Sequence, residues 1–153
     1  MKPNCCLLTA ILLLLSTSVN AFDLKADEAQ FDTKRKVHYL IGNVTANLNG
    51  KTFMADMIVI HMKKNGTEAK KVIATGNVSY SDGKILVTAK KCESDMLSVT
   101  FQKDVIIKGN DYGTLKADRV VYQIKTGIVN ITAKNRVKFV LDGNLEKKLT
   151  KKK

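Results

Sequence analysis

The chain has 153 residues, of which 26 are Lys or Arg and 14 are Asp or Glu, so its formal net charge at pH 7 is +12. This length suits a single domain. Hydrophobic residues at 44% and charged residues at 26% are typical of a globular protein and argue against disorder. With only two His, the composition excludes a His-rich metal site, and a nucleophile–His centre would have to use His38 or His61.

The first 21 residues are typical of a secretory signal peptide. Lys2 precedes an apolar run at 7–15, and a small-residue ending follows at Val19-Asn20-Ala21. The apolar run is about half of the roughly 20 residues that a membrane-spanning helix needs. We therefore expect cleavage before Phe22 and export to a bacterial periplasm. An uncleaved membrane anchor is the alternative.

The remainder of the chain repeats one unit four times. The first marker of the unit is Ala-Asp, which is degenerate in the third copy, and its Ala residues are Ala26, Ala55, Ala89 and Ala117. The second marker is Gly-Asn-Val, which is degenerate in the last two copies, and its Val residues are Val44, Val78, Val105 and Val137. Two markers in the same order predict four related structural units.

Apolar residues alternate on both sides of each marker. Around the marker Ala they lie at −2 and 0 and then at +3 and +5, so the alternation shifts by one residue. That shift predicts a β-strand with a bulge or corner that redirects its buried face. Around the marker Val the alternation is strict, and the Gly-Asn before it favours a bend. Turn dipeptides such as Asn49-Gly50 and Asp82-Gly83 join consecutive strands as hairpins.

The predicted fold class is all-β. We expect a folded antiparallel meander, β-slab or jelly-roll-like. Each of the four repeats is two bent strands or four short ones, which gives about sixteen short strands. It occupies residues 22–145 and precedes a basic tail at 146–153 with five Lys, which we expect to be disordered. The first and last strands each leave one free edge, and free edges invite strand addition from another chain. The candidate edge-docking residues are Phe22, Leu24, Val137, Phe139 and Leu141.

Five segments carry motifs of a known family: 24–32, Gly42-Asn43-Val44, 54–59, Gly76-Asn77-Val78 and 116–122. Together with the signal peptide they resemble the LptA/OstA family of periplasmic lipopolysaccharide-transport proteins. The resemblance implies a Gram-negative periplasm and a β-slab that binds the lipid part of lipopolysaccharide and stacks head to tail with its own copies. The implied partners are an LptC-like inner-membrane subunit and an LptD-like outer-membrane barrel. An LptC-like subunit that keeps its N-terminal anchor is the alternative within this pathway.

The apolar columns are candidates for a lipid groove. Exposing an acyl chain of about a dozen carbons to water costs roughly 10 kcal/mol of free energy, so a carrier needs a continuous apolar groove. In any β-sandwich the same columns are ordinary core, and this interpretation stays beside the first. The candidate lipid-binding residues are Phe31, Ile58, Ile60, Val72, Val99, Phe101, Val105, Tyr122, Ile131 and Phe139. The aromatic members offer the largest contact area.

No enzyme, cofactor or metal site is predicted. His38 falls in an apolar column and His61 alternates towards solvent, and neither has a nucleophile at recognisable spacing. Cys92 is the one Cys after residue 21, so it has no disulfide partner there, and its column predicts an inert buried side chain. The marker Asp residues, one per repeat, are expected to bond turn backbone.

The basic charge has two interpretations. A basic rim would attract the anionic groups of lipopolysaccharide, and the tail would contact an anionic membrane surface. A solvated tail that aids solubility fits equally well. Nucleic-acid binding is not expected, because the chain has an export signal and no RNP1-type stacking motif. A scaffold that recruits partners only by edge-strand pairing, without lipid, is the functional alternative.

Overall fold

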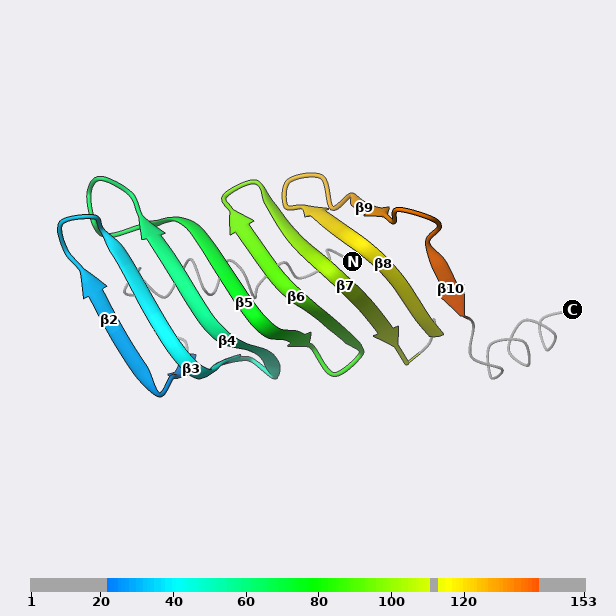
Figure 1. The fold of residues 1–153 in the computed structure, drawn as a ribbon, viewed down its shortest axis with the longest axis horizontal. Coiled ribbons are helices and arrows are strands. Elements are labelled where there is room, and N and C mark those ends of the chain that lie inside the picture. The colour runs from blue at the N-terminus through cyan, green and yellow to red at the C-terminus, as the bar shows by residue number, and fades with distance from the viewer. Residues whose placement is uncertain (1–21, 111–112, 141–153) are drawn as a thin grey trace, which may run out of the picture.

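The computed structural model describes residues 22–110 and 113–140, which form one antiparallel β-sheet (Figure 1). Its ten strands are β1 (Phe22–Lys25), β2 (Glu28–Asp32), β3 (Val37–Leu48), β4 (Lys51–Met62), β5 (Ala69–Ser81), β6 (Ile85–Asp95), β7 (Ser98–Gly109), β8 (Gly113–Gln123), β9 (Val129–Thr132) and β10 (Lys138–Val140). The order across the sheet is β1-β3-β4-β5-β6-β7-β8-β10, while β2 also pairs with β3 and β9 with β8. The predicted all-β meander is confirmed.

Some predictions concern residues outside the described ranges. These are the signal peptide at 1–21, Leu141 and the basic tail at 146–153. Within the described ranges every regular element is a strand, so they hold no helix able to cross a membrane.

The predicted count of about sixteen short strands is wrong: the described residues form ten strands, and the central ones match the other interpretation, of bent strands. The six central strands, β3 to β8, are 11 to 13 residues long and run through the predicted corners without a break. At each corner the ladder shifts register, as between Ile41 and Val44 or between Gln102 and Val105. A bulge leaves hydrogen-bonded ladder on both sides, so a corner does not end a strand. Only at the two edges does the chain divide into separate short strands.

The two sequence markers lie side by side at these bulges. Gly42 and Asn43 have positive φ angles of 79° and 45°, and the second copy repeats this at Gly76 and Asn77, with 74° and 44°. Gly and Asn are the residues that adopt this left-handed conformation at least cost. Gly is required here for a second reason, because a Cβ on Gly76 would lie 2.3 Å from the Oδ2 atom of Asp56.

Each marker Asp accepts a hydrogen bond across the bulge. Asn43 Nδ2 donates to Asp27 at 2.8 Å, and Asn77 Nδ2 donates to Asp56 at 3.0 Å. In the last copy the backbone N–H of Lys134 donates to Asp118 at 2.6 Å. The expected bond to backbone is therefore found at Asp118, whereas Asp27 and Asp56 bond a side-chain amide, because the adjacent strand places an Asn beside each of them.

The degenerate third copy is a matched replacement. Lys103 and Asp104 take the place of Gly-Asn, with φ angles of 64° and 52°. Lys90 takes the place of the marker Asp, and its Nζ lies 2.6 Å from Asp104 Oδ2. The carboxylate has moved from one strand to the other, and a polar contact across the bulge is retained.

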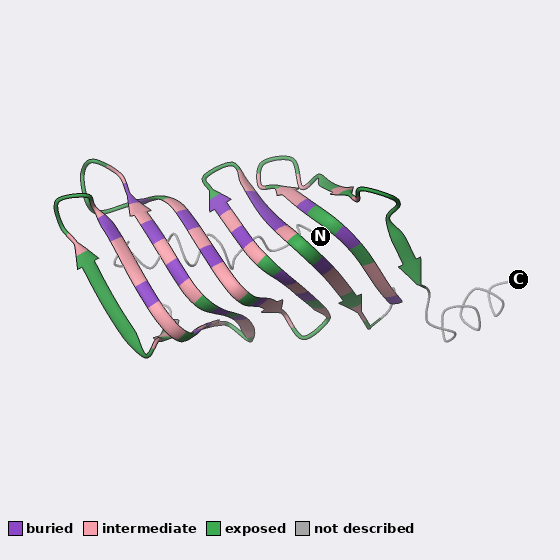
Figure 2. Cartoon of the chain, in the orientation of Figure 1, coloured by how far each residue is buried: buried purple, intermediate pink, exposed green. Residues whose placement is uncertain are grey.

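The sheet is folded on itself along the line of bulges. Phe53 lies before the bulge of β4 and Ile58 after it, yet both are almost fully buried and belong to one hydrophobic cluster. The described residues contain no second sheet or helix that would cover them. The two halves of the same sheet therefore cover each other. Figure 2 shows buried bands across the central strands, whereas β2 and β10 are exposed.

Candidate functional site

The inward side chains form continuous rows across the sheet, called here the inward rows. One row joins the cross-strand neighbours Leu24, Ala46, Phe53, Tyr80, Val87, Ile107, Leu115 and Phe139. Beyond the bulges a second row joins Ala29, Leu40, Ile58, Ala74, Cys92, Phe101, Val120 and Ile131. A third joins Phe31, His38, Ile60, Val72, Ser94, Val99, Tyr122 and Val129. The rows form an almost uninterrupted apolar strip from one edge of the sheet to the other.

Eight of the ten candidate lipid-binding residues belong to one hydrophobic cluster; seven of them lie in the inward rows, and Val105, opposite Ala117, lies beside the rows at the line of bulges. Six of them are buried: Ile58, Ile60, Val72, Val99, Phe101 and Val105. Tyr122 and Ile131 are partly buried and pack against those six. The centre of the strip is thus filled by protein side chains that contact one another across the fold of the sheet.

The other two candidates, Phe31 and Phe139, are 63% and 52% exposed. Both stand at the end of an inward row, on the edge strands β2 and β10, and no other strand of the described residues lies beyond them. The ring of Phe31 contacts His38 edge-on, with 4.9 Å between ring centroids. Val129 ends the same row at the opposite edge and is 50% exposed. The apolar strip therefore reaches the surface at both edges.

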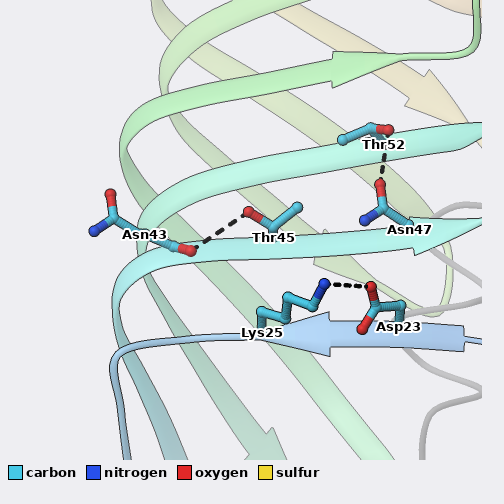
Figure 3. Close-up of polar contacts among 6 residues, drawn as sticks. All are labelled: Asp23, Lys25, Asn43, Thr45, Asn47 and Thr52. Carbon is cyan, nitrogen blue, oxygen red and sulfur yellow. Dashed lines mark hydrogen bonds and ion pairs between the residues drawn. The ribbon is translucent and has the colours of Figure 1, made fainter.

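The edge-docking candidates lie where the sequence places them, as far as the structure describes them. Phe22 and Leu24 belong to β1, whose described partner is β3 alone. Phe139 belongs to β10, which pairs with β8, and Val137 precedes it and is exposed. On β1 itself, Lys25 pairs with Asp23 at 3.0 Å (Figure 3).

Behind that edge strand, polar side chains of β3 and β4 also form hydrogen bonds. Thr52 Oγ1 donates to Asn47 Oδ1 at 2.8 Å, and Thr45 Oγ1 donates to the carbonyl of Asn43 at 3.4 Å (Figure 3). The first contact joins β4 to β3 and the second lies within β3, so neither uses the outer side of β1.

Sequence reasoning missed two features of the edges. Val129 continues the alternation two residues before Ile131, and extending that column would have found it. A hollow of about 380 Å³ lies beside the turn between β2 and β3, lined by Gln30, Phe31, Asp32, Thr33, Lys34 and Tyr39. No local pattern marks this hollow, because it depends on how the turn sits against β3.

Cys92 is the cysteine of the inward rows. Cys92 is buried, and burial, helped by the charge of Glu93, raises its pKa to about 12. Its thiol is neutral near pH 7 and therefore a poor nucleophile, as the sequence predicts. A hydrogen bond from Lys91 is the main cause that lowers the pKa of Glu93. The described residues contain no group of three or more side chains able to hold a metal ion.

Comparison with known proteins gives two matches. Residues 23–128 match the family model described as LptA/(LptD N-terminal domain) LPS transport protein. Among solved structures, the chain is similar to LptH, the LptA homologous periplasmic component of the conserved lipopolysaccharide transport device from Pseudomonas aeruginosa. The TM-score is 0.64 at 17% identity, with 80% of this chain and 96% of that chain covered, which shows a shared fold. Comparison with curated protein sequences gave no match.

Proposed function

The chain belongs to the LptA/LptD N-terminal domain family of lipopolysaccharide-transport proteins, and from that premise we propose that it is a non-enzymatic periplasmic carrier. It binds the lipid A part of lipopolysaccharide between the two halves of its folded sheet and passes it from the inner to the outer membrane. The observation that carries the proposal is the apolar strip, which crosses the sheet and ends in exposed residues at both edges.

The burial of the strip is compatible with a lipid guest. Removing the apolar surface of each acyl chain from water is favourable by roughly 10 kcal/mol. When a chain enters, contacts between the two halves of the sheet are replaced by contacts between each half and the lipid. Because both kinds of contact are apolar, the exchange costs far less than exposing either surface to water. Val72 and Phe101, which lie in rows beyond the bulges, would then touch the guest instead of the opposite half.

Transfer between molecules needs continuity at the edges. We propose that copies stack head to tail by pairing the β1–β2 edge of one copy with the β9–β10 edge of the next. Main-chain hydrogen bonds supply the affinity in strand addition of this kind. An LptC-like inner-membrane subunit and an LptD-like outer-membrane barrel would occupy the two ends of the stack.

Two alternatives are separable by experiment. A scaffold that works by edge pairing alone is favoured by the close packing of row centres such as Ile58, which is 1% exposed. Such a scaffold forms stacks but carries no lipid in native mass spectrometry. An anchored LptC-like subunit retains Met1, whereas a cleaved carrier begins at Phe22, so N-terminal sequencing of the exported protein distinguishes them.

The lipid path is tested by photo-crosslinking. A photoreactive residue placed at Phe101 or at Tyr122 is expected to capture lipopolysaccharide, because both side chains belong to the inward rows. Gln102, the next residue of β7, is the matched control, since successive side chains of a strand point to opposite faces. Equal capture at Phe101 and Gln102 would contradict an internal lipid path.

A further inference from the structure

The two free edges of the sheet carry opposite charge. Residues 22–32, which form the β1–β2 edge, contain four acidic side chains and one basic one, a net charge of −3. Residues 129–140, which form the β9–β10 edge, contain three basic side chains and no acidic one, a net charge of +3. The acidic edge stands out because the chain as a whole is at +12.

The charges of the basic edge are uncompensated within the described part of the protein. Its cations are Lys134, Arg136 and Lys138; all three are exposed, and no described carboxylate forms an ion pair with them. On the acidic edge, Asp27 accepts from an Asn amide and Glu28 from the Gln30 amide at 2.7 Å. Both partners are neutral, so these two carboxylates keep their charge available to another molecule.

The inward rows define how two such edges would meet. If a second copy continues the rows, its Leu24 lies opposite Phe139 of the first copy and its Phe31 lies opposite Val129. The strands are then antiparallel, and the exposed apolar ends of the rows cover each other.

In this register the outward side chains are complementary. Asp23 of the second copy is a diagonal neighbour of Lys138, and Glu28 is a diagonal neighbour of Lys134. Diagonal neighbours on antiparallel strands are within reach of long side chains. Asp27 comes beside Arg136 at the break between β9 and β10. One like-charge contact opposes these pairs, Lys25 opposite Lys138, and Asp23, which pairs with Lys25 at 3.0 Å, is then the counter-charge shared by both lysines.

We infer that edge charge sets the polarity of self-association, with the acidic β1–β2 edge as receptor for the basic β9–β10 edge of a second copy. This inference rests on the stacking in the proposed function and adds its determinant of specificity. Pairing of two acidic or two basic edges brings like charges together, which suppresses the wrong partner and slows its approach. Head-to-tail contact is selected by electrostatics, although strand pairing alone would allow any edge to meet any other.

Two charge-reversal variants test the inference in the exported protein. The first, K134E/R136E/K138E, makes both edges acidic, and the second, D23K/E28K, makes both edges basic. Each variant alone is expected to associate roughly tenfold more weakly than wild type in sedimentation velocity at about 0.05 M salt. Mixed in equal amounts they are expected to recover association, because each edge then meets one of opposite charge. The control K64E/K70E/K84E makes the same change of charge as the first variant, at exposed positions outside both edge segments.

The outcomes separate this inference from the stacking itself. Weak association of each variant, recovery on mixing and an unaffected control support it. Wild-type stacking that both variants retain overturns the inference and leaves stacking intact. If neither variant associates, alone or mixed with the other, while circular dichroism shows both to be folded, charge complementarity is likewise refuted. A wild type that stays monomeric at low salt removes both the stacking proposal and the inference.

Discussion

The packing of Asp56 against Gly76 makes a sharp prediction about stability. In Gly76→Ala the new Cβ would lie 2.3 Å from Asp56 Oδ2, so the carboxylate must move and its 3.0 Å hydrogen bond with Asn77 is lost. The left-handed backbone costs an Ala about 1–2 kcal/mol, and the lost hydrogen bond adds about 0.5–1.5 kcal/mol. We expect the free energy of unfolding to fall by about 1.5–3.5 kcal/mol in urea denaturation followed by circular dichroism.

Gly66→Ala is the matched control for this variant. Gly66 has the same φ of 74°, but a Cβ there would meet nothing within 4 Å. It is expected to cost only the backbone term, about 1–2 kcal/mol. Adding Asp56→Ala to Gly76→Ala removes the clash, so Asp56→Ala should cost less in the Gly76→Ala background than in wild type. Equal losses at the two glycines, together with additive effects of Gly76→Ala and Asp56→Ala, would refute the reasoning.

Three further predictions follow from the bulges, the buried thiol and the exposed row ends. Lys90→Asp places a second carboxylate beside Asp104 and should lower the urea midpoint of unfolding slightly. The triple variant K90D/K103G/D104N restores the residue pattern of the other copies. It should be neutral or stabilise the protein by up to about 1 kcal/mol, because position 103, which has a positive φ, is then a glycine. Cys92 should resist thiol reagents at pH 8 in the folded protein and react once the protein is unfolded in urea. Because folding raises the pKa of this thiol from 9.0 to about 12, its contribution to stability is full below pH 9 and is lost as the pH rises towards 12. The stability of Cys92→Val should therefore fall less steeply than that of wild type over this pH range. Phe31→Ala should change the unfolding midpoint little, because the ring is 63% exposed, but it should weaken self-association measured by sedimentation. Phe53 is 2% exposed, so Phe53→Ala should lower the free energy of unfolding by about 3–5 kcal/mol in the same unfolding assay.

Alternation of apolar residues predicts the inward rows well, because every second side chain of a strand points to the same face. Ile58 and Val72 follow from this period alone, and cross-strand pairing then places them in adjacent rows. The strand count is harder to predict. In the sequence, the pair Gly42-Asn43 resembles a turn that ends a strand. In the structure both residues have a positive φ, yet the hydrogen-bonded ladder resumes at Val44.

Features that depend on position within the sheet are outside the reach of the repeat pattern. Phe31 occupies the same column as Ile60, but it is exposed because its strand is an edge. Lys90 reads as a defect of the third copy until the register places it beside Asp104. In both cases the decisive neighbour lies on another strand, so the residue's own segment carries no signal.

The bulge line also bears on how a packed core could admit a lipid. Ladder hydrogen bonds run between neighbouring strands within each half of the sheet, and the cross-bulge contacts Asn43–Asp27, Asn77–Asp56 and Lys90–Asp104 also join neighbouring strands. The two halves that face each other contact through apolar side chains of one cluster. Spreading the halves about the bulges would therefore separate apolar surfaces while leaving main-chain hydrogen bonds in place. In the proposed function an acyl chain would replace the apolar contacts that are lost, so opening would be favourable with lipid and unfavourable in water alone.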